Sequence, residues 1–105
     1  MRFVETRVFT NRITGLLSDD EYHALQLVLW FRPEQGPIIR GGGGIRKIRW
    51  KSGRSGKRAG IRIIYFWDDP EDTIYMLFAY PKSAQDDLTP EQLKILRRLV
   101  EEELK

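Results

Sequence analysis

The chain has 105 residues, among them 18 Lys or Arg, 15 Asp or Glu, one His and no Cys. This length fits a single domain spanning residues 1–105, large enough to bury a core without a disulfide or metal staple. The lack of Cys excludes disulfides and thiolate metal sites, and one His leaves too few ligands for a metal centre, so we expect no cofactor and no metal. No segment resembles a signal peptide or approaches the ~20 apolar residues of a membrane span, which predicts a cytoplasmic protein.

The N-terminal part of the chain carries the signals of a strand and of a capped helix. Residues 2–7 can add a strand to a sheet. Ser18 and Glu21 form a capping-box pair directly before an apolar run, because their side chains can satisfy amide groups at a helix start. The pattern predicts a helix from there to about Phe31, stopped by Pro33.

The middle of the chain changes to β-rich runs. Residues 45–51 alternate between polar and apolar, while 61–67 and 73–80 are nearly continuous in apolar residues, as is typical of central strands covered on both faces. The intervening segments 52–60 and 68–72 predict turns, so the three runs form antiparallel hairpins. One face of the first run is cationic, with Lys47, Arg49 and Lys51.

The C-terminal segment predicts a second capped helix. It begins at Thr89, has Pro90 at the first helical position and runs to the end of the chain. Together these elements predict an α+β fold, in which an antiparallel sheet packs with two N-terminal helices and one C-terminal helix.

Charge is strongly segregated along the chain. Residues 40–62 contain nine Lys or Arg and no Asp or Glu, whereas the rest of the chain has a net charge of −6. Such a block is favoured on a folded domain when a polyanion neutralises it, so RNA is the expected partner; a solvated basic loop or the protection of a sheet edge is the structural alternative. The expected RNA-binding residues are Arg40, Arg46, Lys51, Arg54, Lys57 and Arg58.

Arg62 is the most informative single residue. It shares a strand face with Ile64 and Phe66, which places a guanidinium on an otherwise apolar surface. A buried charge is unfavourable unless it is paired or belongs to a ligand site. The alternative is an arginine at a frayed strand end that pairs with Asp68 or Asp69.

Other conspicuous residues have structural interpretations. The run 41–44 of four glycines lacks the Gly-Lys-Ser/Thr ending of a phosphate loop and is not placed between a strand and a helix. We therefore interpret it as a flexible segment that leads into the basic strand. His23 lies in the first turn of a predicted helix, where a surface or half-buried role is expected. Capping and turn chemistry explain the carboxylate pairs Asp19/Asp20, Asp68/Asp69 and Asp86/Asp87 better than catalysis does.

Several spaced features together resemble the RelE/HigB toxins of bacterial toxin–antitoxin systems, and the HigB-like subgroup in particular. They are the glycines 41–44, the strand 45–49, Gly56-Lys57-Arg58, the strand 62–65 and Tyr80-Pro81-Lys82. The resemblance covers most of the chain and implies a small RelE-like α+β fold. It also implies an mRNA interferase, which is a ribosome-dependent endonuclease that cuts mRNA and inhibits translation, and an antitoxin encoded by the adjacent gene.

The resemblance implies four catalytic residues, which are Lys47, Arg49, Arg62 and Lys82. The chain departs from RelE at two points. Ser83 stands where RelE continues with arginine, and no tyrosine follows Tyr80, although RelE has one in its C-terminal segment. The resemblance therefore does not identify the general base and the general acid. Tyr80 or a ribosomal nucleotide could take the place of the missing tyrosine.

The chemistry suits such a cationic site. RNA is cut without metal when its 2′-OH attacks the adjacent phosphate, which requires a base, an acid and stabilisation of the phosphoryl charge. A lysine among other cations gives up its proton more readily than an isolated one, so Lys47 or Lys82 is a candidate base while Arg49 and Arg62 hold the phosphate. The alternatives are a ParE-like toxin that inhibits gyrase by binding, and a plain RNA- or ribosome-binding module.

Overall fold

The structure of the protein is a computed structural model, and it describes residues 1–51 and 60–105. The predicted α+β class is confirmed, with two helices before the strands of the meander and one helix after them. The predicted loop 52–60 lies, apart from Gly60, outside the described residues. In chain order the elements are β1 (Arg2–Glu5), α1 (Arg7–Leu16), α2 (Asp19–Phe31), β2 (Arg46–Trp50), β3 (Ile61–Asp68), β4 (Thr73–Pro81), α3 (Pro90–Leu99) and the π-helical turn η1 (Val100–Leu104).

The sheet has the strand order β1-β4-β3-β2. β3 is antiparallel to both β2 and β4, as the hairpin pattern predicts. β1 runs parallel to β4 instead, so the sheet is mixed rather than wholly antiparallel. The connectivity explains this difference: α1 and α2 carry the chain from β1 to the far edge of the sheet, and two hairpin reversals then bring β4 beside β1 in the same direction.

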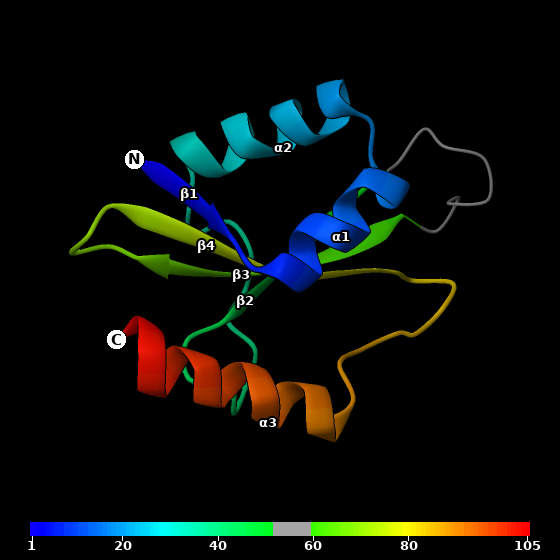
Figure 1. Cartoon of the computed structure of the whole chain (residues 1–105). Helices are drawn as coiled ribbons and strands as arrows, with labels where there is room; N and C mark the ends of the chain where they lie inside the picture. The colour runs from blue at the N-terminus through cyan, green and yellow to red at the C-terminus, as the bar shows by residue number, and fades with distance from the viewer. Residues whose placement is uncertain (52–59) are drawn as a thin grey trace.

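Helices cover both faces of the sheet (Figure 1). On one face, Phe9 of α1 and Leu25 of α2 belong to a buried cluster that includes Ile63 of β3. On the other face, Leu96 of α3 forms a second buried cluster with Ile64 and other strand residues. β3 and β4 are therefore buried on both sides, which explains why their sequences are nearly continuous in apolar residues.

Local side-chain hydrogen bonds set where the helices begin. The Glu21 amide donates to the Ser18 hydroxyl at 3.1 Å, and the Ser18 amide donates to the Glu21 carboxylate at 2.8 Å. Thr89 and Gln92 form the same reciprocal pair at the start of α3. The sequence predicts that this helix runs to the end of the chain. The α-helix ends at Leu99, and the π-helical turn η1 continues it to Leu104. No helix within the described residues is long and apolar enough to cross a membrane.

β4 contains a bulge in the middle of its pairing with β3. Ile64 pairs with Phe78, but the next residue of β3 pairs with Met76, which leaves Leu77 as the extra residue. Leu77 and Phe78 consequently both join the cluster under α3. A bulge increases the local twist and redirects the strand, here just before its contact with Arg62.

Candidate functional site

Two arginines face each other across neighbouring strands. Arg49 of β2 pairs in register with Arg62 of β3, and Arg62 pairs in turn with Tyr80 of β4. Lys47 stands two residues before Arg49, opposite Ile64, so it projects from the same face of the sheet. The predicted cationic strand face therefore exists, and it lies on the side of the sheet that α3 covers.

Arg62 is buried without a carboxylate partner among the described residues. The residue is only 5% exposed. Its Nη1 donates to the neighbouring Ile61 carbonyl at 3.5 Å, which is the upper limit of a hydrogen bond. None of the ion pairs among the described residues involves Arg62, so the alternative of a pair with Asp68 or Asp69 is not what the structure has. A buried guanidinium in this situation is costly unless an anion completes its environment.

Arg62 opens onto a small basic cavity of about 360 Å³. The Lys82 amide donates to the Gly60 carbonyl at 3.1 Å, which fixes the chain just after β4 against the start of β3. Four cationic side chains therefore converge on one hollow from three neighbouring strands or their ends. The lining residues are Arg49, Trp50, Lys51, Gly60, Arg62 and Lys82.

Lys47 lies beside this cavity and is paired with a carboxylate. Its Nζ is 2.7 Å from Oδ1 of Asp87, which belongs to the segment between β4 and α3. The hydrogen bond and charge of Lys47, followed by the charges of Arg62 and Arg49, hold the pKa of Asp87 below its ordinary value. Asp87 is therefore influenced by three cations of the cluster. The sequence interpretation of the Asp86/Asp87 pair as turn residues missed its contact with Lys47.

Tyr80 sits next to Arg62 but inside the protein. It is 1% exposed, and its buried hydroxyl has no hydrogen-bond partner in the part of the chain that the structure describes. Burial raises the pKa of Tyr80, and the charge of Asp87 adds to the increase while Arg62 opposes it. The phenol therefore keeps its proton at neutral pH, and in this conformation it does not reach a substrate in the cavity.

The other basic residues expected to bind RNA are spread over several places. Arg46 projects from the opposite face of β2, where Nη1 donates to the carbonyls of Glu34 and Gly36 at 3.0 and 2.9 Å. Arg40 is exposed on the connection that precedes β2. Lys51 lines the basic cavity. The remaining three, Arg54, Lys57 and Arg58, lie outside the described residues.

The glycine run serves as a tight connection packed against α3. Gly43 has a φ of +75°, and a Cβ there would lie 3.2 Å from the side chain of Arg97. Gly44 has a φ of +111°, and a Cβ would lie 3.1 Å from the ring of Phe66. Only glycine adopts these conformations easily so close to neighbouring side chains, so the run has a structural role next to the C-terminal half of α3.

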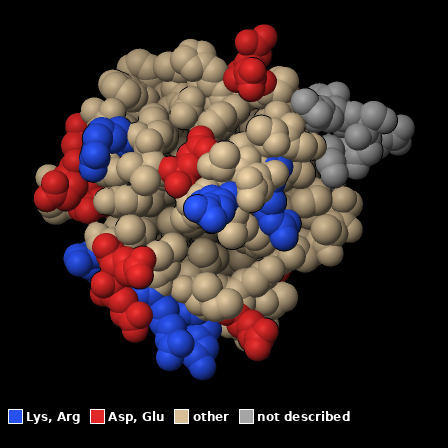
Figure 2. Space-filling view, viewed as in Figure 1, with Lys and Arg blue, Asp and Glu red and all other residues tan. Residues whose placement is uncertain are grey.

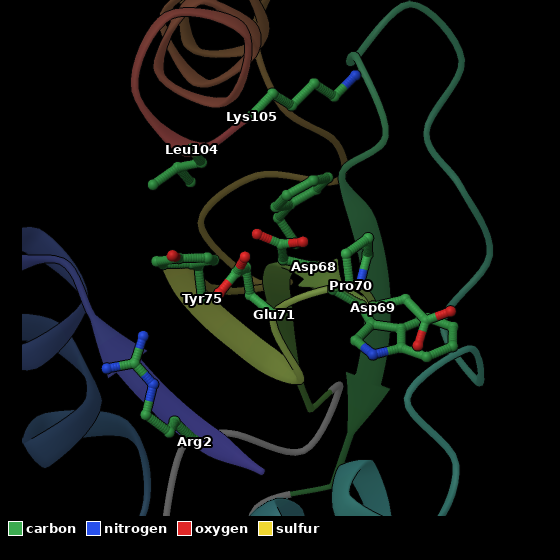
Figure 3. Close-up of a pocket in the computed structure, with 10 residues that line it drawn as sticks. Arg2, Asp68, Asp69, Pro70, Glu71, Tyr75, Leu104 and Lys105 are labelled. Atoms are coloured by element: carbon green, nitrogen blue, oxygen red, sulfur yellow. The ribbon is translucent and has the colours of Figure 1, made fainter.

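A cavity of about 740 Å³, larger than the basic cavity, lies at the other end of the molecule. Figure 3 shows Arg2 and Lys105 at this cavity on different elements, with Asp68 at the end of β3 and Glu71 in the β3–β4 turn between them. Figure 2 shows acidic side chains gathered at this edge of the molecule. Because its carboxylates repel phosphate, this cavity does not compete with the basic cavity for a polyanion, although it is larger.

No protein-family model matches the chain. The structure is similar to a chain of the intact E. coli RelBE toxin–antitoxin complex, with a TM-score of 0.57 and 16% identity over 73% of this chain and 90% of that chain. It is also similar to a mutant of the E. coli toxin RelE in the free state, with a TM-score of 0.56 and 17% identity over 80% of this chain and 85% of that chain. The chain has the RelE fold. At this level of identity the likeness concerns the fold.

On this RelE fold, the cavity has the composition of an anion site. Arg62 offers a fixed guanidinium, Arg49 a second one directly opposite, and Lys82 an ammonium at the rim. Trp50 also borders the cavity, but it pairs with Ile61 and packs against the cluster on the opposite face of the sheet. A cluster of cations suits the phosphate backbone of a single-stranded nucleic acid, because each phosphate carries a negative charge.

Proposed function

We propose that this chain is the toxin of a toxin–antitoxin module, and that it is a HigB-like, ribosome-dependent mRNA endonuclease that inhibits translation. The observation that carries the proposal is Arg62, a buried guanidinium that lacks a carboxylate partner among the described residues and opens onto a basic cavity. A structural arginine at this depth would be paired. A buried arginine whose partner is a bound phosphate would lack a carboxylate partner in the ligand-free protein.

The proposed reaction needs no metal. The 2′-OH of the RNA attacks the adjacent phosphate and gives its proton to a base. The bond between phosphorus and the 5′-oxygen breaks, and a general acid gives a proton to the leaving 5′-oxygen. Arg62 and Arg49 hold the phosphoryl oxygens and stabilise the charge that develops on them in the transition state. A planar guanidinium that keeps its charge suits this role better than an amine.

The two lysines have different surroundings and so take different roles in the proposal. Lys82 lines the cavity and forms none of the ion pairs among the described residues, so we assign proton transfer to its amine. Lys47 is paired with Asp87 beside the cavity, so we assign it to the binding of a flanking phosphate. The ribosome would orient the mRNA, because a lysine is a weak base at neutral pH and needs a well-placed substrate.

The proposed partners are the ribosome with its mRNA and an antitoxin encoded by the adjacent gene. The RelBE complex, to which this structure is similar, contains a toxin together with an antitoxin. A toxin of this kind acts where translation takes place, so we propose a cytoplasmic location. Co-expression of the neighbouring gene should relieve growth arrest and yield a complex that purifies with this chain.

Mapping of mRNA 5′ ends after brief induction in a bacterial host tests the proposed function. Wild type should create new 5′ ends within translated coding regions in minutes, and Arg62→Ala should not. Growth arrest with intact mRNA and inhibited gyrase supercoiling would instead favour the ParE-like alternative. Ribosome binding without any cleavage would favour the plain binding module.

A further inference from the structure

Asp87 is the carboxylate that touches the basic cluster. Among the described residues, its ion pair with Lys47 is the one contact between an acidic side chain and the cationic face of β2. The Asp87 side chain is 74% exposed and that of Lys47 is 22% exposed. The carboxylate therefore lies on the solvent side of the amine, where an incoming anion would approach.

The position of Asp87 is set by the start of α3. Its backbone carbonyl accepts a hydrogen bond from Gln85 Nε2 at 2.9 Å, and the same nitrogen donates to Gln92 Oε1 at 2.8 Å. Gln92 Oε1 also accepts from the Thr89 amide at 2.9 Å, which is half of the capping box. The backbone at Asp87 is thus anchored to a helix end, while its side chain can rotate away from Lys47 without breaking this network.

The pair is easily displaced. Exposed ion pairs add little net stability, because water solvates both separated charges well and holding the two side chains together costs conformational entropy. One phosphate of the RNA supplies a negative charge to Lys47. The neighbouring phosphate binds Arg49 and Arg62 at the same time. RNA, which binds through several phosphates at once, therefore displaces the single Asp87 carboxylate from Lys47.

We propose that Asp87 is a displaceable counter-ion of the RNA site, which occupies the Lys47 ammonium in the RNA-free protein and yields it to a backbone phosphate when RNA binds. This inference rests on the proposed function. Lys47 and Arg49 are two residues apart on one strand face, about 6.6 Å along the strand. This separation is of the order of the distance between successive phosphates in an extended single strand, so Lys47 holds the phosphate next to the one at Arg62.

The counter-ion has a consequence for affinity and selectivity. It neutralises one of the cations in the free protein, and it repels anions that are too short to bring a second phosphate to Arg62. Removal of its charge should therefore strengthen the binding of RNA without changing the chemical step. A carboxylate that takes part in catalysis would behave in the opposite way.

The test is binding of a 2′-O-methyl RNA hexanucleotide, which cannot be cleaved by 2′-OH attack, measured by fluorescence anisotropy. Asp87→Asn should bind the oligonucleotide about threefold more tightly than wild type, on the scale expected for an exposed ion pair. Asp86→Asn is the matched control, because it removes the same charge one residue away without touching Lys47, and it should change the affinity much less. In a Lys47→Met background, Asp87→Asn should lose most of its effect.

Single-turnover cleavage of mRNA on programmed ribosomes separates this inference from the function on which it rests. Asp87→Asn should cleave at the wild-type rate at saturation, with half-saturation at a lower protein concentration. If wild type cleaves but Asp87→Asn binds no more tightly than Asp86→Asn, or loses cleavage at saturation, the counter-ion role is wrong and the proposed function stands. If wild type neither binds the hexanucleotide nor cleaves mRNA, both proposals are wrong.

Discussion

Arg49 and Arg62 lie directly opposite each other on β2 and β3. Like charges in facing positions of an antiparallel pair repel each other, and here one of the two guanidinium groups is buried. The two apolar clusters on either side of the sheet stabilise the strands in spite of this repulsion. The free protein therefore carries an unfavourable charge pair that a bound anion would relieve.

We expect inorganic phosphate to stabilise the protein through this pair. At a phosphate concentration ten times the dissociation constant, binding to the native state adds about 1.4 kcal/mol to the free energy of unfolding. Arg49→Thr should lose at least half of that gain, although it should be as stable as wild type or slightly more stable without phosphate, since it removes the repulsion. Thermal unfolding with and without phosphate, at ionic strength matched with chloride, measures both effects.

Arg32→Ala provides the control for this experiment. Arg32 is an exposed cation at the C-terminal end of α2, on the other face of the sheet. Its removal should leave the phosphate effect unchanged. Equal stabilisation of wild type and Arg49→Thr would contradict an anion site between the two arginines.

Two buried tyrosines should respond to loss of the hydroxyl in opposite ways. Tyr65 accepts a hydrogen bond from the Gly36 amide at 2.9 Å and donates to the Pro33 carbonyl at 2.7 Å, so Tyr65→Phe leaves two groups unpaired and should cost about 1–3 kcal/mol. The Tyr80 hydroxyl is buried without a partner among residues 1–51 and 60–105, so Tyr80→Phe should be neutral or stabilising by up to about 1 kcal/mol. Urea unfolding of both variants measures the difference, and equal losses of stability would contradict it.

Alkaline pH should destabilise the fold through its tyrosines. Burial is the largest cause that raises the pKa of Tyr22, Tyr65 and Tyr80, and the hydrogen bond to the Glu5 carboxylate raises that of Tyr22 further. Because the folded-state values lie above the unfolded value of 10.0, this contribution to stability is fully present below pH 10 and is lost as pH rises above it. The urea midpoint should be constant from pH 7 to 9 and fall steeply above pH 10. A midpoint that stays constant to pH 11 would contradict the burial of these phenols.

Neighbouring cations on β2 should have separable effects. Arg46 faces away from the basic cavity and donates to two backbone carbonyls, so Arg46→Met should lower the free energy of unfolding by about 1–2 kcal/mol. It should leave the salt dependence of RNA binding unchanged. Lys47→Met should instead lower the slope of log K against log salt by about 0.7, the value for one phosphate contact with a single strand. Oligonucleotide binding over a salt series tests this, and equal slopes for both variants would contradict it.

The sequence predicts well those features that depend on residues close together in the chain. The capping boxes at Ser18 and Thr89 were predictable because each joins residues three positions apart. The hairpins of the meander and the cationic face with Lys47 and Arg49 follow from the alternation of side chains along a strand. The burial of Arg62 follows from the apolar run around it.

Features that depend on distant residues could not be predicted in the same way. The contact of Lys47 with Asp87 joins residues 40 positions apart, and no local pattern indicates which turn reaches the basic strand. The parallel placement of β1 depends on where two helices return the chain. The hydrogen bonds of Arg46 depend on carbonyls of the preceding connection, and no local pattern around Arg46 indicates them.

The central claim is that Arg62 meets a phosphate during RNA cleavage, and single-turnover cleavage of a short mRNA on programmed ribosomes tests it most directly. Arg62→Ala should cleave about 100-fold or more slowly than wild type at saturating enzyme, the usual scale for loss of a transition-state charge partner, with ribosome binding little changed. Arg32→Ala should cleave at the wild-type rate, and thermal unfolding should confirm that both variants are folded. Cleavage by folded Arg62→Ala at the wild-type rate would contradict the assignment of this site.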